Sequence, residues 1–535
     1  MTGVIALSCL DTIPYCERLE VGHLYGDIKV AKMSRRQFVR VLGGIGAGAA
    51  GMFFADCAGL HGSDGEVRTA GMASAAAAGA VPAGAVTGRK PNFVIIFFDD
   101  MGYGDLGCYG SKVNRTPAID RMCGEGTKFT SFYVTSGVCS PSRSSLMTGC
   151  YPLRVGIHES SRGCFVLVPG DKRGLNPKEI TIARLLKDQG YATGCIGKWH
   201  LGDQPAFFPT QFGFDYYFGI PFSNDMGSET NEDKNGKTPP LPLMRNETVI
   251  EAPVDQRTVE RKYTAEAVKF IEANKDKPFF LYLPHMHVHL PYRPGKEFAG
   301  KSDNKEYGDM MAELDWSTGE ILRAVKRLGL DDNTLVILTS DNGAIRRGSN
   351  APLSGGKGTT MEGGMREPCV MRWPGKVPAG TICDEVCSTI DLLPTLARLA
   401  GTHEPTDRII DGKDIADLMF GKLGAGSPHT EGFFYYFMSQ LQAIRLGKWK
   451  LRLPLDPEIA GFTGQPKEKT EPRLFDLEAD IGEKNNVASE HPDVVAKLTA
   501  LVEKARNDIG DYKHKGAGAR EPGYVEHPVF IEKEK

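Results

Sequence analysis

Four short apolar runs, each ending abruptly in charged or polar residues, constrain the fold of this chain most strongly. They cover residues 92–98, 191–196, 278–283 and 335–339. The first run is apolar on both faces, which is typical of a strand buried inside a parallel sheet. Amphipathic segments at 180–188 and 310–328 predict helices between the runs. Strands that alternate with helices predict an α/β fold, with a mainly parallel central sheet flanked by helices.

The polar residues that follow the apolar runs predict a single site. In parallel α/β sheets, ligands bind beyond the carboxyl ends of the strands. Four strand ends carry polar groups here, and we expect these groups to meet at one edge of the sheet. They are Asp99 and Asp100, Lys198 and His200, the histidines His285, His287 and His289, and the pair Asp341 and Asn342.

Two of these strand ends favour a metal site. Asp99, Asp100, Asp341 and Asn342 offer only oxygen ligands, and such donors suit Ca²⁺ or Mg²⁺ rather than zinc. Taken singly, each pair is equally well interpreted as a turn beside the glycine that follows it. Taken together with other polar strand ends, the two pairs favour a common cation.

A third element places a cysteine at the start of a predicted helix. Residues 139–143 read Cys-Ser-Pro-Ser-Arg, and Pro141 suits a first helical turn because its missing N–H is not needed there. Cys139 then lies at the positive end of the helix dipole, where anions are favoured. Arg143, four residues on, returns to the same face. A buried structural cysteine is the alternative interpretation of this segment alone.

The front of the chain differs from the rest in composition. Arg35 and Arg36 precede a weakly apolar, Gly/Ala-rich stretch at 41–55, an order that resembles a bacterial twin-arginine export signal. Because that stretch is too short to span a membrane, we expect residues 33–57 to be a signal peptide. A basic tail without export function is the alternative. The signal predicts export to the bacterial periplasm by the twin-arginine translocation machinery.

Further boundaries follow from this interpretation. A signal should start a chain, so residues 1–32 are expected to be a start-site extension, and residues 58–90 an Ala/Gly-rich linker. Lipid anchoring at Cys57 is disfavoured because Asp56 precedes the cysteine. We expect the large α/β domain to span residues 91–425 and a smaller C-terminal α+β subdomain to span 426–535. In the smaller part, short strands are predicted at 433–437, 443–445 and 451–453, and a helix near 492–507.

The charge balance excludes capture of nucleic acid by bulk charge. The 535 residues include 64 Lys and Arg against 67 Asp and Glu, which gives a net charge of -3. A nucleic-acid-binding chain is expected to be more basic, and we predict no nucleic-acid partner. Any anion-binding site in this chain must therefore be a local cluster of cations.

The chain resembles the type I sulfatases, in the branch similar to arylsulfatase A. The resemblance rests on Cys139-Ser140-Pro141-Ser142-Arg143, which matches the family signature C-x-P-x-R. It extends over most of the chain from residue 92 to about 511. Further matching motifs lie at residues 99–105, 146–149, 197–202, 219–225, 340–343, 356–364, 442–451 and 474–477. The resemblance implies an alkaline phosphatase-like fold and hydrolysis of sulfate monoesters.

The resemblance also implies a modified cysteine and a cation. Cys139 would be oxidised by a sulfatase-maturating enzyme to formylglycine (3-oxoalanine), whose hydrate has two hydroxyls. One hydroxyl would attack sulfur, and the other would then expel sulfate. The cation, Ca²⁺ in first place and Mg²⁺ in second, would be held by Asp99, Asp100, Asp341, Asn342 and residue 139.

Other residues take roles by the same resemblance. Arg143 and Lys198 would stabilise the ionised hydrate, and Lys198 and Lys357 would neutralise the sulfate as charge develops. Asp341 would accept the proton of the attacking hydroxyl. His200 would take the proton of the second hydroxyl during release of sulfate.

One histidine would protonate the leaving alcohol. His289 is the first choice because His289-Leu290-Pro291 matches the family pattern His-x-Pro, and His287 is the second. Ser223 would hydrogen-bond within the substrate site. Two departures from the family pattern concern the modification signal and specificity: Cys150 and Ser354 stand where many relatives have arginine.

Two other functions are consistent with these residues. One is a phosphonate monoester hydrolase or phosphodiesterase that uses the same metal-assisted chemistry. The other, from a different class, is a non-catalytic protein that binds sulfated glycans and keeps residue 139 unmodified. The substrate of a sulfatase would be a sulfated small molecule or glycan, and no motif in this sequence chooses between them.

Overall fold

The structure is a computed structural model that describes residues 89–229, 238–455, 459 and 471–532. The predicted start-site extension at 1–32, the signal peptide at 33–57 and most of the linker at 58–90 lie outside the described residues. In the described part of the chain, no helix is both long and apolar enough to cross a membrane.

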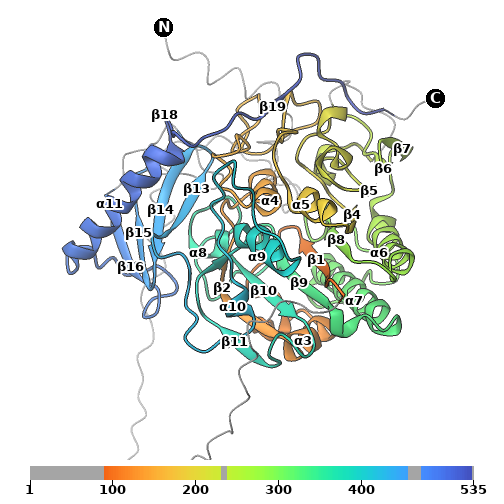
Figure 1. Ribbon diagram of the computed structural model, residues 1–535, viewed down its shortest axis with the longest axis horizontal. Coiled ribbons are helices and arrows are strands. Elements are labelled where there is room, and N and C mark those ends of the chain that lie inside the picture. The colour runs from red at the N-terminus through yellow and green to blue at the C-terminus, as the bar shows by residue number, and fades with distance from the viewer. Residues whose placement is uncertain (1–88, 230–237, 456–458, 460–470, 533–535) are drawn as a thin grey trace, which may run out of the picture. The chain divides into compact units, whose positions relative to one another are not determined.

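A large, mainly parallel sheet organises the larger part of the described chain (Figure 1). Its centre, β9-β1-β8-β4-β5, is parallel throughout, while β10 and the edge strands β6 and β7 pair antiparallel. In spatial order the strands are β11 (Thr381–Cys383), β2 (Thr127–Tyr133), β10 (Arg366–Arg372), β9 (Thr334–Ser340), β1 (Asn92–Phe98), β8 (Phe279–Pro284), β4 (Ala192–Ile196), β5 (Tyr216–Gly219), β6 (Leu243–Arg245) and β7 (Thr248–Glu251), with β12 (Cys387–Ser388) beside β2.

Helices cover both faces of this sheet because side chains alternate along each buried strand. In β1, Phe93, Ile95 and Phe97 pack on one side with helices α4, α5 and α9. The intervening Val94, Ile96 and Phe98 pack on the other side with α3, α6 and α7. The bounds are α3 (Pro117–Gly124), α4 (Cys139–Thr148), α5 (Ile182–Asp188), α6 (Gln256–Ala273), α7 (Lys305–Arg327), α8 (Glu362–Met365), α9 (Leu392–Leu399) and α10 (Ala416–Met419). The predicted α/β architecture is confirmed.

Short 3-10 turns complete the connections of the described chain. They are η1 (Gly107–Tyr109), η2 (Pro205–Phe207), η3 (Pro209–Phe212), η4 (Asn224–Met226), η5 (Asp331–Asn333) and η6 (Thr389–Asp391).

A second, antiparallel sheet follows in the C-terminal part, as predicted. It consists of β13 (Phe433–Phe437), β14 (Gln440–Leu446), β15 (Trp449–Arg452) and β16 (Arg473–Asp476), and Figure 1 shows it beside α11 (Pro492–Asp508). Leu498 and Val502 of α11 pack into the same core as Ile444 and Leu451 of the sheet.

A late segment of the chain returns to the larger part. After the short hairpin of β17 (Gly510–Asp511) and β18 (His514–Lys515), strand β19 (Gly523–Tyr524) pairs antiparallel with β3 (Arg173–Gly174). The region 426–535 therefore includes a terminal strand that belongs to a ladder of the larger domain.

A buried ionic cluster lies where the two sheets meet, and we call it the junction cluster. Its centre is Glu362 of α8, whose Oε1 accepts hydrogen bonds from Lys450 Nζ at 2.9 Å and from the Tyr435 hydroxyl at 3.0 Å. Its Oε2 accepts a hydrogen bond from the Tyr133 hydroxyl of β2. The other members are Arg366, Arg445 and Glu483. Because these residues come from both sheets, the cluster joins the two parts of the chain.

Candidate active site

The carboxyl ends of four neighbouring strands bring the predicted polar residues together. β9, β1, β8 and β4 are adjacent and parallel, so the residues after them emerge at the same edge. These residues are almost inaccessible to solvent, and the most exposed of them is His289, at 8%. The structure therefore places one buried polar site at this edge.

Backbone geometry fixes the directions of these side chains. Gly197, which follows β4, has a φ of +140°, and a Cβ there would lie 1.9 Å from the carbonyl oxygen of Pro284. Only glycine allows this close approach, which delivers Lys198 to the site. Asp100 and His200 adopt φ values of 63° and 59°, a left-handed conformation that non-glycine residues rarely accept and that concentrates at functional sites.

Cys139 is the first residue of α4, as the sequence predicts. Its Sγ lies 3.6 Å from Asp99 Oδ1 and 3.4 Å from Lys357 Nζ. Burial raises the pKa of the Cys139 thiol well above its usual range, despite the nearby cations of Lys198 and Lys357. Because the thiolate is the nucleophilic form, the unmodified thiol is poorly suited to attack a substrate here.

Buried ion pairs surround this cysteine. We call the residues Asp99, Asp100, Cys139, Arg143, Lys198, Asp341 and Lys357 the site cluster. Lys198 Nζ contacts Asp99 Oδ2, and Lys357 Nζ lies 2.7 Å from Asp100 Oδ1. Burial alone would raise the pKa of Asp99, but Lys198 and Arg143 outweigh it and hold this pKa well below its usual range. Asp99 is therefore a carboxylate at neutral pH.

Arg143 reaches across the site to Asp341. Its Nε and NH2 atoms donate to Asp341 Oδ2 at 3.1 and 2.8 Å, and NH1 donates to the carbonyl oxygen of Lys198 at 3.1 Å. Asp341 Oδ1 accepts the backbone N–H of Asp100 at 3.1 Å. Burial and the charge of Asp99 raise the pKa of Asp341 to about 6, near the pH at which a general base works best.

The donor set fits a cation. The ligand atoms of Asp99, Asp100, Cys139 and His289 all lie within 4.8 Å of one another. Asn342 donates from Nδ2 to Asp100 Oδ1 at 2.8 Å, and its own Oδ1 is buried without a hydrogen-bond partner. A buried amide oxygen without a partner is costly unless a further group completes it, and carboxylate and amide oxygens suit Ca²⁺ or Mg²⁺.

Asp99, Asp100 and Cys139, three of the predicted ligands, belong to this compact group. Asp341 contacts Arg143 and the backbone N–H of Asp100, and its role as a ligand stays a prediction. His289, predicted as a proton donor and a substrate-binding residue, also belongs to the group. Its Nε2 lies 3.7 Å from Asp100 Oδ2.

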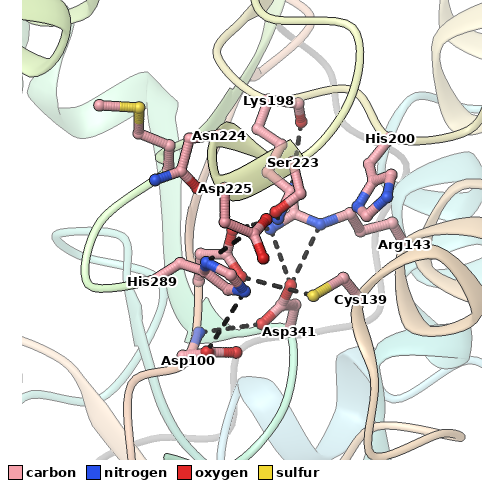
Figure 2. A network of polar contacts seen from close by, with 12 residues as sticks. Asp100, Cys139, Arg143, Lys198, His200, Ser223, Asn224, Asp225, His289 and Asp341 are labelled. Carbon is pink, nitrogen blue, oxygen red and sulfur yellow. Dashed lines mark hydrogen bonds and ion pairs between the residues drawn. The ribbon is translucent and has the colours of Figure 1, made fainter. Parts of the chain in front are cut away.

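The structure separates the two candidate histidines. His289 points into the site beside Asp100 and Cys139 (Figure 2), and its Nδ1 donates to the carbonyl oxygen of Leu290 at 2.6 Å. Its Nε2 is therefore the atom available to exchange a proton within the site. His287 faces away, with its Nε2 3.3 Å from Glu313 Oε2.

His200 is held as a neutral base. Its Nε2 donates to the carbonyl oxygen of Leu167 at 2.9 Å, and its buried Nδ1 has no hydrogen-bond partner. Burial, reinforced by the charge of Lys198, lowers the pKa of His200 well below its usual range. Nδ1 therefore carries a lone pair that can accept a proton or hydrogen bond.

Ser223 and Lys198 are also in contact. Lys198 Nζ donates to Ser223 Oγ at 2.9 Å (Figure 2). The same ammonium group also contacts Asp99 Oδ2. The predicted place of Ser223 in the site is therefore supported by a direct contact.

Sequence reasoning missed one positioning residue, Glu260 of α6. Its Oε1 accepts the backbone N–H groups of Met286 and His287, each at 3.0 Å, and its Oε2 bonds to His285 Nδ1. Glu260 thus holds the backbone that leads to His289. It lies on the buried face of α6 together with Val259 and Tyr263, and an acid on an apolar helical stripe was the available signal.

Two protein-family models match most of the described chain. The model of the sulfatase family matches residues 91–402, and the C-terminal region of aryl-sulfatase matches residues 427–520. The site residues named above from Asp99 to Lys357 all lie within the first match.

Individual proteins agree with these matches. The chain is 38% identical to human arylsulfatase A over 461 residues, covering 79% of this chain and 89% of the relative. It is 36% identical to N-acetylgalactosamine-6-sulfatase of Canis lupus familiaris over 473 residues, covering 81% and 88%. A solved structure, Ps i-CgsB in complex with k-i-k-neocarrahexaose, superposes with a TM-score of 0.67 at 31% identity, covering 78% of this chain and 92% of that one.

Proposed function

This chain belongs to the sulfatase family and hydrolyses sulfate esters, and we propose that it does so through a formylglycine formed from Cys139, with Ca²⁺ bound beside it. One observation carries this proposal. Cys139 stands at the first position of α4 with its sulfur between Asp99 and Lys357, at the centre of the site cluster. A side chain placed there meets both the oxygen donors of a cation site and the cations that an anionic ester requires.

The modification explains why a poorly reactive thiol occupies this position. A hydrated aldehyde at residue 139 would supply one hydroxyl to attack sulfur and a second to release sulfate. Asp341, with its pKa raised to about 6, is the base for the first proton, and Arg143 holds its carboxylate in place. His200, neutral and with a free Nδ1, is the base for the second proton.

Cations and an acid complete the set of roles. Lys198 and Lys357 are paired with Asp99 and Asp100, and their ammonium groups would neutralise sulfate oxygens. His289 exchanges a proton at Nε2 and is the acid for the leaving alcohol. Asp99, Asp100, Asp341, Asn342 and residue 139 are the groups that would hold Ca²⁺, which would polarise a sulfate oxygen.

The proposed substrate is a sulfated small molecule or a sulfated glycan. Relatives are named for aryl sulfates and for N-acetylgalactosamine 6-sulfate, and a structural neighbour was solved with an oligosaccharide. We also propose that a sulfatase-maturating enzyme modifies Cys139 and that the twin-arginine machinery exports the chain to the periplasm. These two proposals rest on the sequence around residues 139–143 and 33–57.

Turnover and mass spectrometry together test the proposal. We expect protein purified from its own host to hydrolyse 4-nitrophenyl sulfate faster than phenyl phosphonate, and faster phosphonate turnover would favour the related hydrolase instead. The tryptic peptide of residues 129–143 should carry the mass of an aldehyde in place of the thiol. An intact thiol in inactive protein would contradict the mechanism and favour a binding protein without catalysis.

A further inference from the structure

A surface cavity lies outside the site cluster, between the loop of residues 158–174 and the C-terminal tail. This cavity, which we call the tail groove, has a volume of about 630 Å³. Three basic side chains, Arg162, Lys172 and Arg173, line it together with Glu521, Tyr524 and two prolines. None of these residues takes part in the mechanism above.

The basic groups of the tail groove are largely uncommitted. Arg162 donates to the backbone carbonyl of Gly170 at 2.9 Å, and among the described residues no carboxylate forms an ion pair with Arg162 or Lys172. Arg173 NH1 donates to the backbone carbonyl of Glu159 at 3.0 Å and lies 3.6 Å from the Glu159 carboxylate. The acid of the groove, Glu521, is instead paired with Lys515. The groove therefore presents a local excess of positive charge on a nearly neutral chain.

An exposed aromatic ring stands beside these cations. Tyr524 is 58% exposed, and Lys172 Nζ lies 5.7 Å from the centre of its ring. An aromatic face with adjacent cations matches the chemistry of a sulfated sugar, because the apolar face of the pyranose can pack on the ring while its sulfates meet the cations. A simple phosphate site would not need the ring.

The walls of the tail groove are held by backbone hydrogen bonds. Strand β19 pairs with β3 in the register Gly523 with Gly174 and Tyr524 with Arg173. The N–H of Val525 donates to the carbonyl oxygen of Lys172 at 2.9 Å. Because a ladder fixes both walls, a ligand that enters need not order them, which lowers the entropic cost of binding.

The same loop that lines the groove also touches the active site. The N–H of Leu167 donates to Ser140 Oγ at 3.1 Å, and its carbonyl accepts from His200 at 2.9 Å. Gly170, which lines the groove, is three residues further on, so the two Cα atoms are at most about 11 Å apart. The tail groove and the active site therefore share one loop.

We propose that the tail groove is a second binding site for a sulfated oligosaccharide, which holds part of a polymeric substrate while one of its esters is cleaved. This inference rests on the proposed function, because it assumes that the ester cleaved at residue 139 belongs to a sulfated glycan. It predicts that affinity for a sulfated polysaccharide depends on residues that a small aryl sulfate never meets.

Equilibrium binding of fluorescein-labelled dextran sulfate to the full chain tests the proposal. The Cys139→Ala background prevents turnover, and fluorescence anisotropy reports affinity. We expect the pair Arg162→Ala and Lys172→Ala to weaken binding roughly fivefold to twentyfold, since each exposed ionic contact contributes up to about 1 kcal/mol. The matched control removes the same charge from α7 with Arg323→Ala and Lys326→Ala, and it should change affinity less than about twofold.

A third variant separates sugar from charge. Tyr524→Ala should weaken binding of dextran sulfate but not of polyvinyl sulfate, which has no sugar ring. Equal losses for the groove pair and the α7 pair, or no loss for either, would overturn the proposal. So would equally tight binding of single-stranded DNA, because the groove would then be a general polyanion surface.

The inference and the proposed function fail in different ways. If wild-type enzyme releases sulfate from 4-nitrophenyl sulfate while the groove pair binds dextran sulfate normally, only the second site is wrong. If the groove pair loses affinity while modified wild-type enzyme releases no sulfate from any ester, the second site stands and the proposed function is wrong.

Discussion

The site cluster and the junction cluster both bury three positively charged side chains among carboxylates, but they differ in how far their central polar groups are hydrogen-bonded. In the junction cluster, both oxygens of Glu362 accept hydrogen bonds from lysine and tyrosine groups. At the site, the Asn342 amide oxygen and His200 Nδ1 are buried without partners. A network whose polar atoms have hydrogen-bond partners stabilises the fold. A network with unpartnered polar atoms can instead bind a metal ion and a substrate. The predictions below separate these two uses of buried charge.

The largest effect on activity is expected for a substitution in the site cluster. Cys139→Ala should lower kcat for 4-nitrophenyl sulfate by about 10³-fold or more, because no hydroxyl pair can form at residue 139. The midpoint of thermal unfolding should hardly change, since the substitution keeps the Cβ of a small buried residue. Cys123→Ala, at a cysteine outside the site, is the control and should retain activity. Activity near wild type in Cys139→Ala would refute the assignment.

A substitution in the junction cluster should lower stability and leave kcat unchanged. Glu362→Gln should lower the free energy of unfolding by about 3–5 kcal/mol, because Lys450, Arg366 and Arg445 would lose their buried counter-charge. Urea unfolding followed by circular dichroism measures this loss. Molecules that remain folded should keep the wild-type kcat. A variant of normal stability but low kcat would show that the two clusters are not separate in function.

Low pH should weaken the junction cluster. Burial alone would raise the pKa of Glu362, but Lys450 and Arg445 outweigh it and lower this pKa to about 2. Its contribution of roughly 3 kcal/mol is therefore present above the unfolded pKa near 4.5 and is lost as the pH falls toward 2. Stability of the wild type should decline over that interval, and Glu362→Gln should show a shallower decline. Parallel pH profiles for the two proteins would contradict this account.

Removal of the proposed Ca²⁺ should affect only the site cluster. Dialysis against a chelator should abolish activity, and Ca²⁺ should restore it more fully than Mg²⁺. At a hundredfold excess over its dissociation constant, the ion should add about 2.7 kcal/mol to stability, which calorimetry can detect. Glu362→Gln should show the same increment, because Glu362 is not among the residues proposed to bind the metal ion. Full activity after exhaustive chelation would exclude the proposed metal.

The smallest effect is expected at Ser223. Ser223→Ala removes one hydrogen bond to Lys198, and the loss of about 1 kcal/mol should lower kcat/KM roughly fivefold. Thermal stability should stay near wild type. Ser223→Thr, which keeps the hydroxyl, should recover part of the loss, and identical kinetics for alanine and threonine would exclude the hydrogen bond as the cause.

The sequence predicted the strand ends well because their signals are local. An apolar run followed by charged residues marks a buried strand and its end, and parallel pairing then brings Asp99, Lys198 and Asp341 together without further information. The start of α4 at Cys139 was predictable for the same reason. The resemblance to the sulfatase family added catalytic roles for individual residues, which local sequence patterns do not indicate.

Contacts between distant segments were not predictable in this way. The choice between His287 and His289 depends on how Glu260, on a helix earlier in the chain, holds the backbone after β8. The pairing of β3 with β19 joins residues about 350 positions apart, and neither two-residue strand has a recognisable pattern. The junction cluster likewise gathers charges that, in the sequence, look like ordinary solvent-exposed residues.

The pairing of β19 with β3 also bears on the order of events during synthesis. The loop that hydrogen-bonds to His200 and Ser140 is held from behind by Tyr524 and Val525. A ribosome makes Val525 only 386 residues after Cys139. Until Val525 has been made, the segment that packs over the start of α4 therefore lacks this restraint.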